Sequence, residues 1–363
     1  MKKLPFFAAA IACSLTAAHC LSAAEAPPSF MGRWEGKFID SEKKNGRPEL
    51  YAEVIGIGGG RYRIQFLPAF FKRADVIKEV EASAAGEKIV FDEDGWKGEI
   101  VPGSFTGEVA QPKQPLRKFA LAKSSFQSPS LGLRPPEDAT VLFDGKNLDA
   151  WQNAKDGSAV AWVILPDGAL EVTPMKKGFG SGGYGDIRTK EKFGDIRLHL
   201  EFRLPYEPNL HWLDRGNSGV FLQGLYEVQI IDSFGQSGLW NECGAIYHTA
   251  PPKVNACLPP GEWQTYDILF RAARFHPDGS LAECPRITVR QNGILIQYNE
   301  AFCEGTRSIG GIRPSPPPPI TGPIELQDHG HPVQYRNIWA APLTDASAAL
   351  LQTEPLPSSA PQK

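Results

Sequence analysis

The chain has 363 residues, enough for two domains that each bury a core, and its formal net charge is −3. This balance leaves no basic stripe to neutralise a phosphate backbone, so nucleic acid is not an expected partner. With 36 glycines and 32 prolines between many short apolar runs, the composition is typical of a turn-rich β protein.

The chain opens with the pattern of a secretory signal peptide (residues 1–24). Lys2 and Lys3 precede an apolar stretch, and Ser22 and Ala24 supply small residues at the −3 and −1 positions of a cleavage site. A transmembrane anchor is the alternative, but the stretch is short and His19 interrupts it. We therefore expect export to the periplasm or the exterior. No later segment approaches the roughly 18 apolar residues of a span, so no membrane span is expected.

Residues 30–123 predict a small β domain, because several short segments alternate apolar and polar residues between glycine-rich turns. It shows no acid pair, metal-ligand spacing or nucleophile motif, and the simplest interpretation is an accessory domain. Residues 124–139 contain Ser, Gly and three prolines and predict a semi-rigid linker. The Ala/Ser/Pro-rich residues 344–363 predict a flexible tail.

A larger domain is predicted over residues 140–343. Residues 195–203 alternate strictly, and similar strands follow at 218–223, 225–232, 263–270, 286–290, 294–298, 324–327 and 334–340. No helical periodicity of useful length is found. The predicted fold is all-β, a two-sheet jelly-roll sandwich preceded by the small β domain.

Four cysteines follow the signal peptide, and an even number in an oxidising compartment suggests disulfides. A hairpin turn at Asn292-Gly293 would set Cys284 opposite Ala301, two residues from Cys303. A bulge would make that pair bridgeable. Cys243 with Cys257 would be the remaining pair. No Cys-x-x-Cys is present, so a structural zinc site is disfavoured.

Polar side chains at matching strand positions form the candidate substrate groove. A face dense in Gln, His and Glu and bordered by aromatic rings is typical of sugar binding, because such groups hydrogen-bond hydroxyls while rings stack on pyranoses. An ordinary solvated strand face is the alternative. The proposed substrate-binding residues are His199, Glu201, Arg203, Gln223, Gln229, Trp240 and Gln327, with Trp212 and Phe234 as further stacking candidates.

Three ionisable residues are the candidate catalytic groups. Glu227 shares the groove parity, Asp232 closes the same strand before a glycine-containing loop, and His329 follows the strand at 324–327. Asp232 or Glu227 is the preferred base, and His329 a proton donor or metal ligand. Asp232 as a turn cap and His329 as a structural histidine are the alternatives. No cofactor is certain, and a divalent metal is conceivable.

The motifs of the larger domain resemble the 3-keto-disaccharide hydrolase family, formerly a domain of unknown function. The matching segments are VLFDGKNLDAW (141–151), FGD (193–195), LHLEFR (198–203), GNSGVFL (216–222), YEVQI (226–230), CGAIY (243–247), GEWQTYD (261–267), QDHG (327–330) and RNIW (336–339). Two positions depart from the pattern: His248 stands where glycine is common, and His331 where asparagine is frequent.

The resemblance implies a concanavalin-like jelly roll that acts on small glycosides oxidised at C3. A ketone at C3 acidifies the C2 proton, so a base could remove it while the C1 substituent departs. Glycosidases of ordinary jelly rolls carry Glu-x-Asp-x-x-Glu, whereas this strand has Gln229 at the middle position. The alternative function is a non-catalytic, lectin-like carbohydrate-binding module, because sites rather than folds decide function.

Overall fold

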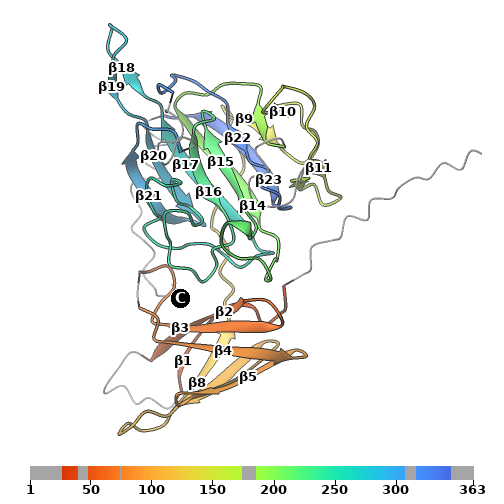
Figure 1. Cartoon of the computed structure of the whole chain (residues 1–363), viewed down its shortest axis with the longest axis vertical. Coiled ribbons are helices and arrows are strands. Elements are labelled where there is room, and N and C mark those ends of the chain that lie inside the picture. Colours follow the sequence, from red (N-terminus) through yellow and green to blue (C-terminus); the bar gives the residue numbers. More distant parts are fainter. Residues whose placement is uncertain (1–26, 40–47, 74, 174–184, 307–315, 345–363) are drawn as a thin grey trace, which may run out of the picture.

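The structure, a computed structural model, describes residues 27–39, 48–73, 75–173, 185–306 and 316–344. The predicted signal peptide and nearly all of the predicted tail lie outside these residues. The described chain forms a barrel and a sandwich that stack end to end (Figure 1). The predicted all-β fold is confirmed, and the described residues include a short 3-10 turn, η1 (Trp212–Asp214).

The smaller domain is a closed antiparallel barrel, since its first strand also pairs with its last. Apolar side chains at alternate positions fill its interior, among them Trp34, Phe66 and Phe105. Closure leaves the barrel with no free sheet edge. The strands are β1 (Gly32–Phe38), β2 (Glu49–Gly56), β3 (Arg61–Leu67), β4 (Lys78–Ala85), β5 (Lys88–Glu93), β6 (Trp96–Val101), β7 (Ser104–Val109) and β8 (Arg117–Lys123).

The larger domain packs two antiparallel sheets face to face. The smaller sheet has the order β10 (Trp151–Asn153), β13 (Ile187–Thr189), β22 (Glu325–Leu326), β15 (Ser218–Leu222), β16 (Tyr226–Ile230). The larger has the order β11 (Val163–Ile164), β12 (Leu170–Glu171), β23 (Gln334–Pro342), β14 (Ile196–Arg203), β17 (Trp263–Arg271), β20 (Arg286–Gln291), β21 (Ile294–Ala301), with β9 (Thr140–Phe143) also on β23. A separate hairpin, β18 (Arg274–Phe275) with β19 (Leu281–Glu283), projects from the end away from the barrel (Figure 1).

The core of the sandwich lies between the two sheets and fixes which side chains face outward. Leu198, Leu200 and Phe202 of β14 enter this core from the larger sheet. Val228 and Ile230 of β16 enter it from the smaller one. Because side chains alternate along a strand, the residues between them lie on the outer faces of their sheets.

Two arginines tie the barrel to the sandwich, one buried (Arg33) and one exposed (Arg73). Arg33 of β1 donates to Glu53 within the barrel at 3.0 Å and to the Cys257 carbonyl of the sandwich at 2.9 Å. Arg73 donates to three sandwich carbonyls, those of Gly238, Pro252 and Lys253. The acceptors are backbone carbonyls, which do not move when a side chain changes rotamer. These contacts therefore hold the two domains in a defined arrangement.

The Cys284–Cys303 disulfide is present, with Cα atoms 5.0 Å apart. The hairpin begins in the predicted register, Gln291 pairing with Ile294, but irregularities shift it by two positions before Arg286 pairs with Ala301. That shift brings the two cysteines opposite each other. The second predicted pair is wrong: Cys243 and Cys257 are buried free thiols, and Cys243 instead contacts the Tyr266 hydroxyl.

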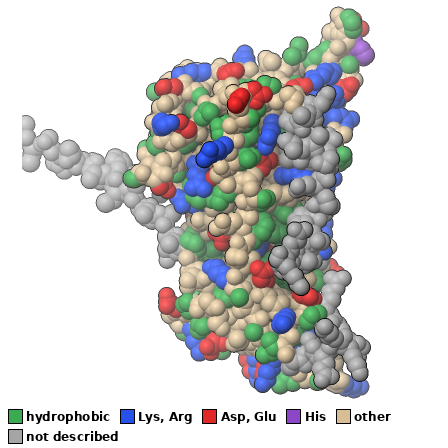
Figure 2. Space-filling model, turned by 180° about the vertical axis from the view of Figure 1, so that it is seen from behind, with side chains coloured by type: hydrophobic (Ala, Val, Ile, Leu, Met, Phe, Trp, Pro, Cys, Tyr) green, Lys and Arg blue, Asp and Glu red, His purple; other side chains and the backbone are tan. Residues whose placement is uncertain are grey.

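The outer surface carries no strong segregation of charge on the face that Figure 2 shows, where acidic and basic side chains are interspersed over the described residues. Among the described residues, no helix is long and apolar enough to cross a membrane.

Candidate functional site

The outer face of the smaller sheet carries a continuous row of side chains across all five strands. Strand register places Gln152, Arg188, Glu325, Phe221 and Glu227 side by side, from β10 to β16. Glu227 and Glu325 are both buried although they point away from the core. Buried carboxylates that face away from the core, beside half-buried polar residues and an aromatic ring, are the composition of a binding groove.

A glycine clears the space that the Glu227 carboxylate occupies. Gly219 of β15 pairs with Gln229, and a Cβ at Gly219 would lie 2.3 Å from Glu227 Oε1. The Gln327 amide donates to the Gly219 carbonyl, so Gln327 flanks the same position from the other side. Glu227, Gln229 and Gln327 are thus brought together around Gly219, as the sequence predicted.

Aromatic residues border the groove beside Glu227. The charge of Glu227, together with burial, raises the pKa of the Tyr247 hydroxyl, which keeps its proton. Trp240, half exposed, lies 6.1 Å from Tyr247 and 3.8 Å from the His248 ring. His248 has φ +58°, a conformation that favours glycine and explains why glycine is common there in the resembled family.

A histidine pair lies beyond Gln327, where the chain leaves β22. His331 is buried and its Nδ1 lies 2.7 Å from Glu207 Oε2, which also accepts the Gly216 amide. The His329 and His331 rings are nearly parallel, with centroids 6.4 Å apart. Burial and the neighbouring His331 lower the pKa of His329, so its ring is largely neutral near pH 7.

Several polar atoms of this region are buried without a hydrogen-bond partner in the structure. They include the Gln327 side-chain oxygen, His331 Nε2 and the Asn217 side-chain oxygen. Such atoms are few in folded proteins, since each costs the desolvation energy of a lost hydrogen bond. A cluster of them on one face indicates that a ligand supplies the partners.

Asp232 stands at the end of this face nearest the barrel, in an ion pair. Its Oδ2 accepts from Arg215 Nε at 2.6 Å, and its Oδ1 accepts the Phe234 amide. Burial raises the pKa of Asp232 although Arg215 opposes the shift. The amide contact is that of a turn cap, so Glu227 is the better placed of the two candidate bases.

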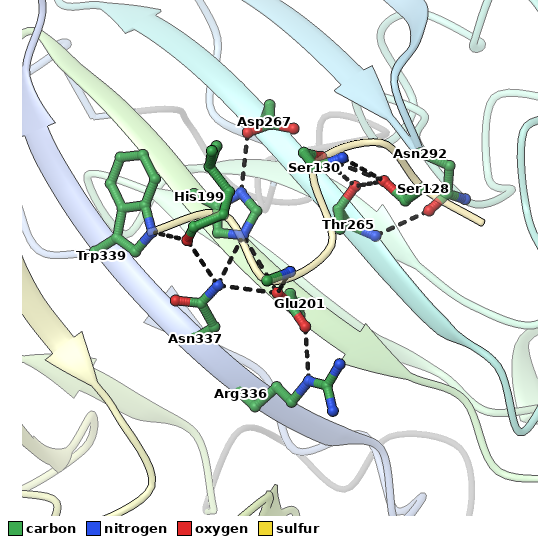
Figure 3. A network of polar contacts seen from close by, with 12 residues as sticks. Ser128, Ser130, His199, Glu201, Thr265, Asp267, Asn292, Arg336, Asn337 and Trp339 are labelled. Atoms are coloured by element: carbon green, nitrogen blue, oxygen red, sulfur yellow. Dashed lines mark hydrogen bonds and ion pairs between the residues drawn. The ribbon is translucent and has the colours of Figure 1, made fainter. Parts of the chain in front are cut away.

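His199, Glu201 and Arg203 lie on the opposite side of the molecule, and their predicted place in the shared groove is wrong. They extend from the outer face of the larger sheet, whereas Glu227 extends from that of the smaller one. Figure 3 shows that part of the linker crosses this outer face. We call that segment (residues 128–133) the linker strap.

The linker strap satisfies the polar groups beneath it. The Gly132 amide donates to Glu201 at 2.6 Å, and Ser128 and Ser130 contact Thr265. Asn337 and Trp339 both donate to the Leu133 carbonyl (Figure 3). The face is therefore closed to a substrate.

The ionisable groups under the strap are fully paired. Glu201 accepts from Arg336 at 2.6 Å and from Asn337 at 2.9 Å, and His199 contacts Asp267 at 2.9 Å. Burial opposes ionisation of Glu201, but its hydrogen bonds prevail and lower its pKa to about 2. Burial likewise opposes protonation of His199, yet Asp267 and Glu201 raise its pKa. Arg203 sits at the rim, bonded to Gln334 and Asp167.

Gln223 is also outside the groove, because it lies in a turn rather than on a strand. Its φ is +54°, and the following Gly224 has φ +68°. Its amide nitrogen donates to the Ile320 carbonyl at 3.1 Å. The strand parity that suggested Gln223 does not extend through such a turn.

The groove also contains residues that were not predicted from the sequence. Glu325 and Arg188 complete the row across the sheet, and Glu207 holds His331. Glu325 precedes Gln327 by two positions within the strand predicted over 324–327, so the parity argument could have found it. Among the described residues, no group of three or more His, Cys, Asp or Glu is arranged to hold a metal ion.

Two solved structures are similar to more than half of this chain. A candidate glycosyl hydrolase from Parabacteroides distasonis, solved at 2.13 Å, is 40% identical with a TM-score of 0.51, over 57% of this chain and 85% of that chain. A second candidate glycosyl hydrolase from that organism, solved at 1.70 Å, is 22% identical with a TM-score of 0.40, over 57% and 95%. No curated protein matches the chain.

The family resemblance is confirmed as well. Residues 138–341, more than half of the chain, match the sequence model described as the 3-keto-alpha-glucoside-1,2-lyase-like domain. The matched segment contains the whole groove. The protein therefore belongs to the 3-keto-alpha-glucoside-1,2-lyase-like domain family and is a carbohydrate-active protein of the glycosyl-hydrolase kind.

Proposed function

We propose that the protein is an exported enzyme that cleaves 3-keto-glucosides at C1 by elimination, followed by hydration. The observation that carries the proposal is the Glu227 carboxylate over Gly219, beside the unpaired Gln327 oxygen, inside the family-matched domain. Export is supported by the Cys284–Cys303 disulfide, because such bonds persist in oxidising compartments.

The chemistry requires a base and an acid on different sides of the sugar. The ketone at C3 acidifies the proton on C2; when a base removes it, the electron pair forms the C1=C2 bond and the C1–O bond breaks. The leaving oxygen takes up a proton, and water then adds to C1 of the enone to give the free 3-keto sugar. In an α-glucoside the C2 hydrogen and the C1 oxygen are axial on opposite ring faces, so one group cannot serve both.

The groove offers residues for each role. Glu227 is the proposed base, since its buried carboxylate lies over Gly219 on the same face as Gln229. His329 is the proposed proton donor to the leaving oxygen, and its lowered pKa makes the protonated ring a stronger acid. Turnover should then rise as the pH falls below the ordinary histidine range. Gln229 and Gln327 would hold the hydroxyls of the keto-sugar.

The decisive experiment compares a 3-keto-α-glucoside with its unoxidised parent. We expect release of the leaving group and transient ultraviolet absorption of an enone from the keto-sugar alone. In D2O, recovered substrate or product should carry deuterium at C2. Hydrolysis of the unoxidised glucoside at a comparable rate would contradict the elimination mechanism. Tight binding of either sugar without any cleavage would support the lectin-like alternative.

A further inference from the structure

The barrel and the sandwich enclose a cavity of about 730 Å³ at the Asp232 end of the groove. Its volume is within the range of about 300–1,000 Å³ that is typical of ligand sites. The sandwich contributes Arg215, Asp232, Trp212 and Trp240 to its wall. The barrel contributes Ile57, Arg63 and Glu81, residues outside the family-matched segment.

Two arginines in this wall have buried N–H groups without partners. Arg215, only 7% exposed, uses Nε on Asp232 and leaves Nη2 unpaired. Arg63 of β3 leaves Nε unpaired. A guanidinium donor removed from water is costly unless something accepts from it. The two donors come from different domains, so a ligand between them would contact both.

Aromatic surface at the same cavity is exposed in an unusual way. Trp212 is 90% exposed, and its φ of +52° is rare for a bulky residue. Strain of this kind persists where a site requires it. Trp240 is 42% exposed on the same wall. Exposed indole faces with hydrogen-bond donors between them are suited to a sugar ring.

The charges of the cavity favour a neutral ligand. Asp232 neutralises Arg215, and Glu81, which lies opposite Arg63 in the register of β3 and β4, forms an ion pair with Arg61. Glu242 accepts the Gly238 and Leu239 amides, and burial raises its pKa. An acidic or strongly cationic group therefore has no excess of opposite charge to bind.

We propose that this junction cavity is the subsite for the leaving group, that the leaving group is a neutral sugar, and that the barrel completes the subsite through Arg63. The inference rests on the proposed function, since the cleaved bond must lie between Glu227 and the cavity. Tyr247 connects the two: its amide donates to the Glu227 carbonyl, and its ring centroid lies 6.1 Å from that of Trp240 in the cavity wall.

The test uses the full mature chain and two keto-substrates that share the glucosyl unit, a 3-keto-disaccharide and methyl 3-keto-glucoside. We expect Arg63→Ala and Trp212→Ala each to lower kcat/KM for the disaccharide about tenfold or more, equivalent to about 1.4 kcal/mol. The methyl glucoside should change less than about twofold. Lys88→Ala on the far strand β5 and Tyr298→Ala, another exposed aromatic, are the matched controls and should change neither.

Equal losses on both substrates, or none on either, would overturn the subsite. Loss with Trp212→Ala but not with Arg63→Ala or the conservative Arg63→Gln would assign the cavity to an aromatic aglycone instead. If no keto-sugar is cleaved, the proposed function fails. The subsite is then tested separately, by measuring the binding of the unoxidised disaccharide with calorimetry. Weaker binding in both alanine variants, with unchanged melting temperatures, supports it; unchanged binding contradicts it.

Discussion

The two outer faces of the sandwich have nearly the same residue types, but one is covered by the linker strap and the other is open. Each presents glutamate, arginine and glutamine from alternate strand positions, and each has histidine, His199 on β14 and His329 and His331 beyond the end of β22. On the larger sheet the linker strap covers these groups, and Glu201 receives donors from Arg336, Asn337 and Gly132. On the smaller sheet the Gln327 oxygen and His331 Nε2 are buried with no partner.

The difference shows that residue type does not identify a site, whereas hydrogen-bond satisfaction does. A polar network whose donors and acceptors are all paired rigidifies a fold. A buried face with unpaired atoms has a free-energy cost that a ligand can remove. Changes on the first face should therefore alter stability, and changes on the second should alter turnover.

The largest effect is expected at Glu227. Replacing it with glutamine keeps its size but removes the base, so kcat for a 3-keto-glucoside should fall by about 10² to 10⁴. The midpoint of urea unfolding should stay within the error of the wild-type value. Substrate affinity, measured by calorimetry, should weaken far less than turnover. A variant that retains turnover would remove Glu227 from the proposed mechanism.

Glu201→Gln is the matched change on the outer face of the larger sheet, which the linker strap covers. It should lower stability and leave kcat unchanged. The variant leaves the Arg336 guanidinium without its charged partner, and losing a hydrogen bond to a charged group costs about 1.5–3 kcal/mol. Urea unfolding should reveal that loss. Well below the melting temperature, kcat should equal that of the wild type. A selective loss of turnover would mean that the two faces are coupled.

A smaller effect on turnover is expected from Gly219→Ala. The added methyl group would lie 2.3 Å from Glu227 Oε1, so the carboxylate must move. Misplacement of a reacting group by about 1 Å lowers rates by up to about 10². Gly194→Ala is the control, because its added carbon meets ordinary contacts of 3.4 Å or more. Equal kcat values for the two variants would show that the glycine does not position the carboxylate.

The smallest effect concerns the pH dependence of stability on the covered face. The folded-state pKa of Glu201 is about 2 against an ordinary 4.5, so its contribution is present above pH 4.5 and is lost as the pH falls toward 2. His199 has the opposite sign: its raised pKa stabilises below pH 6.5, and the gain is lost as the pH rises through the folded value.

Melting temperatures of the wild type and Glu201→Gln should therefore converge on acidification, and those of the wild type and His199→Gln on alkalinisation. If the difference in melting temperature between the wild type and Glu201→Gln does not change with pH, the Glu201 carboxylate is not the source of the stability.

The sequence predicted the fold more completely than the site. Strict alternation over residues 195–203 and the Asn292-Gly293 turn specify local structure, so strands and hairpin register followed from them. Alternation also separates core from outer residues. It does not say which of the two sheets a strand joins. In a sandwich the outer faces of the two sheets lie on opposite sides of the molecule, so that choice decides on which side an outer residue lies. His199 and Glu227 were grouped for this reason.

The remaining errors share a physical cause, namely contacts between segments far apart in sequence. The linker's serines and prolines show no periodicity, so nothing local indicates that Ser128 bonds Thr265, which is 137 positions away. Likewise, the pairing of His331 with Glu207 and the place of Arg63 at the junction arise only from tertiary packing. Strand parity selected Glu227 and Gln327 as candidates, and both also lie in segments that resemble the family, which carries such distant information.

The linker strap bears on where this modular protein can be divided. The family match begins at residue 138, yet Ser128, Gly132 and Leu133 already bond the sandwich. A fragment cut at the family boundary would expose Glu201 and Asn337 and lose ten residues of its own packing. The autonomous unit must therefore start before residue 128, and transplanting a foreign barrel onto this sandwich would succeed only if the strap is kept with the sandwich.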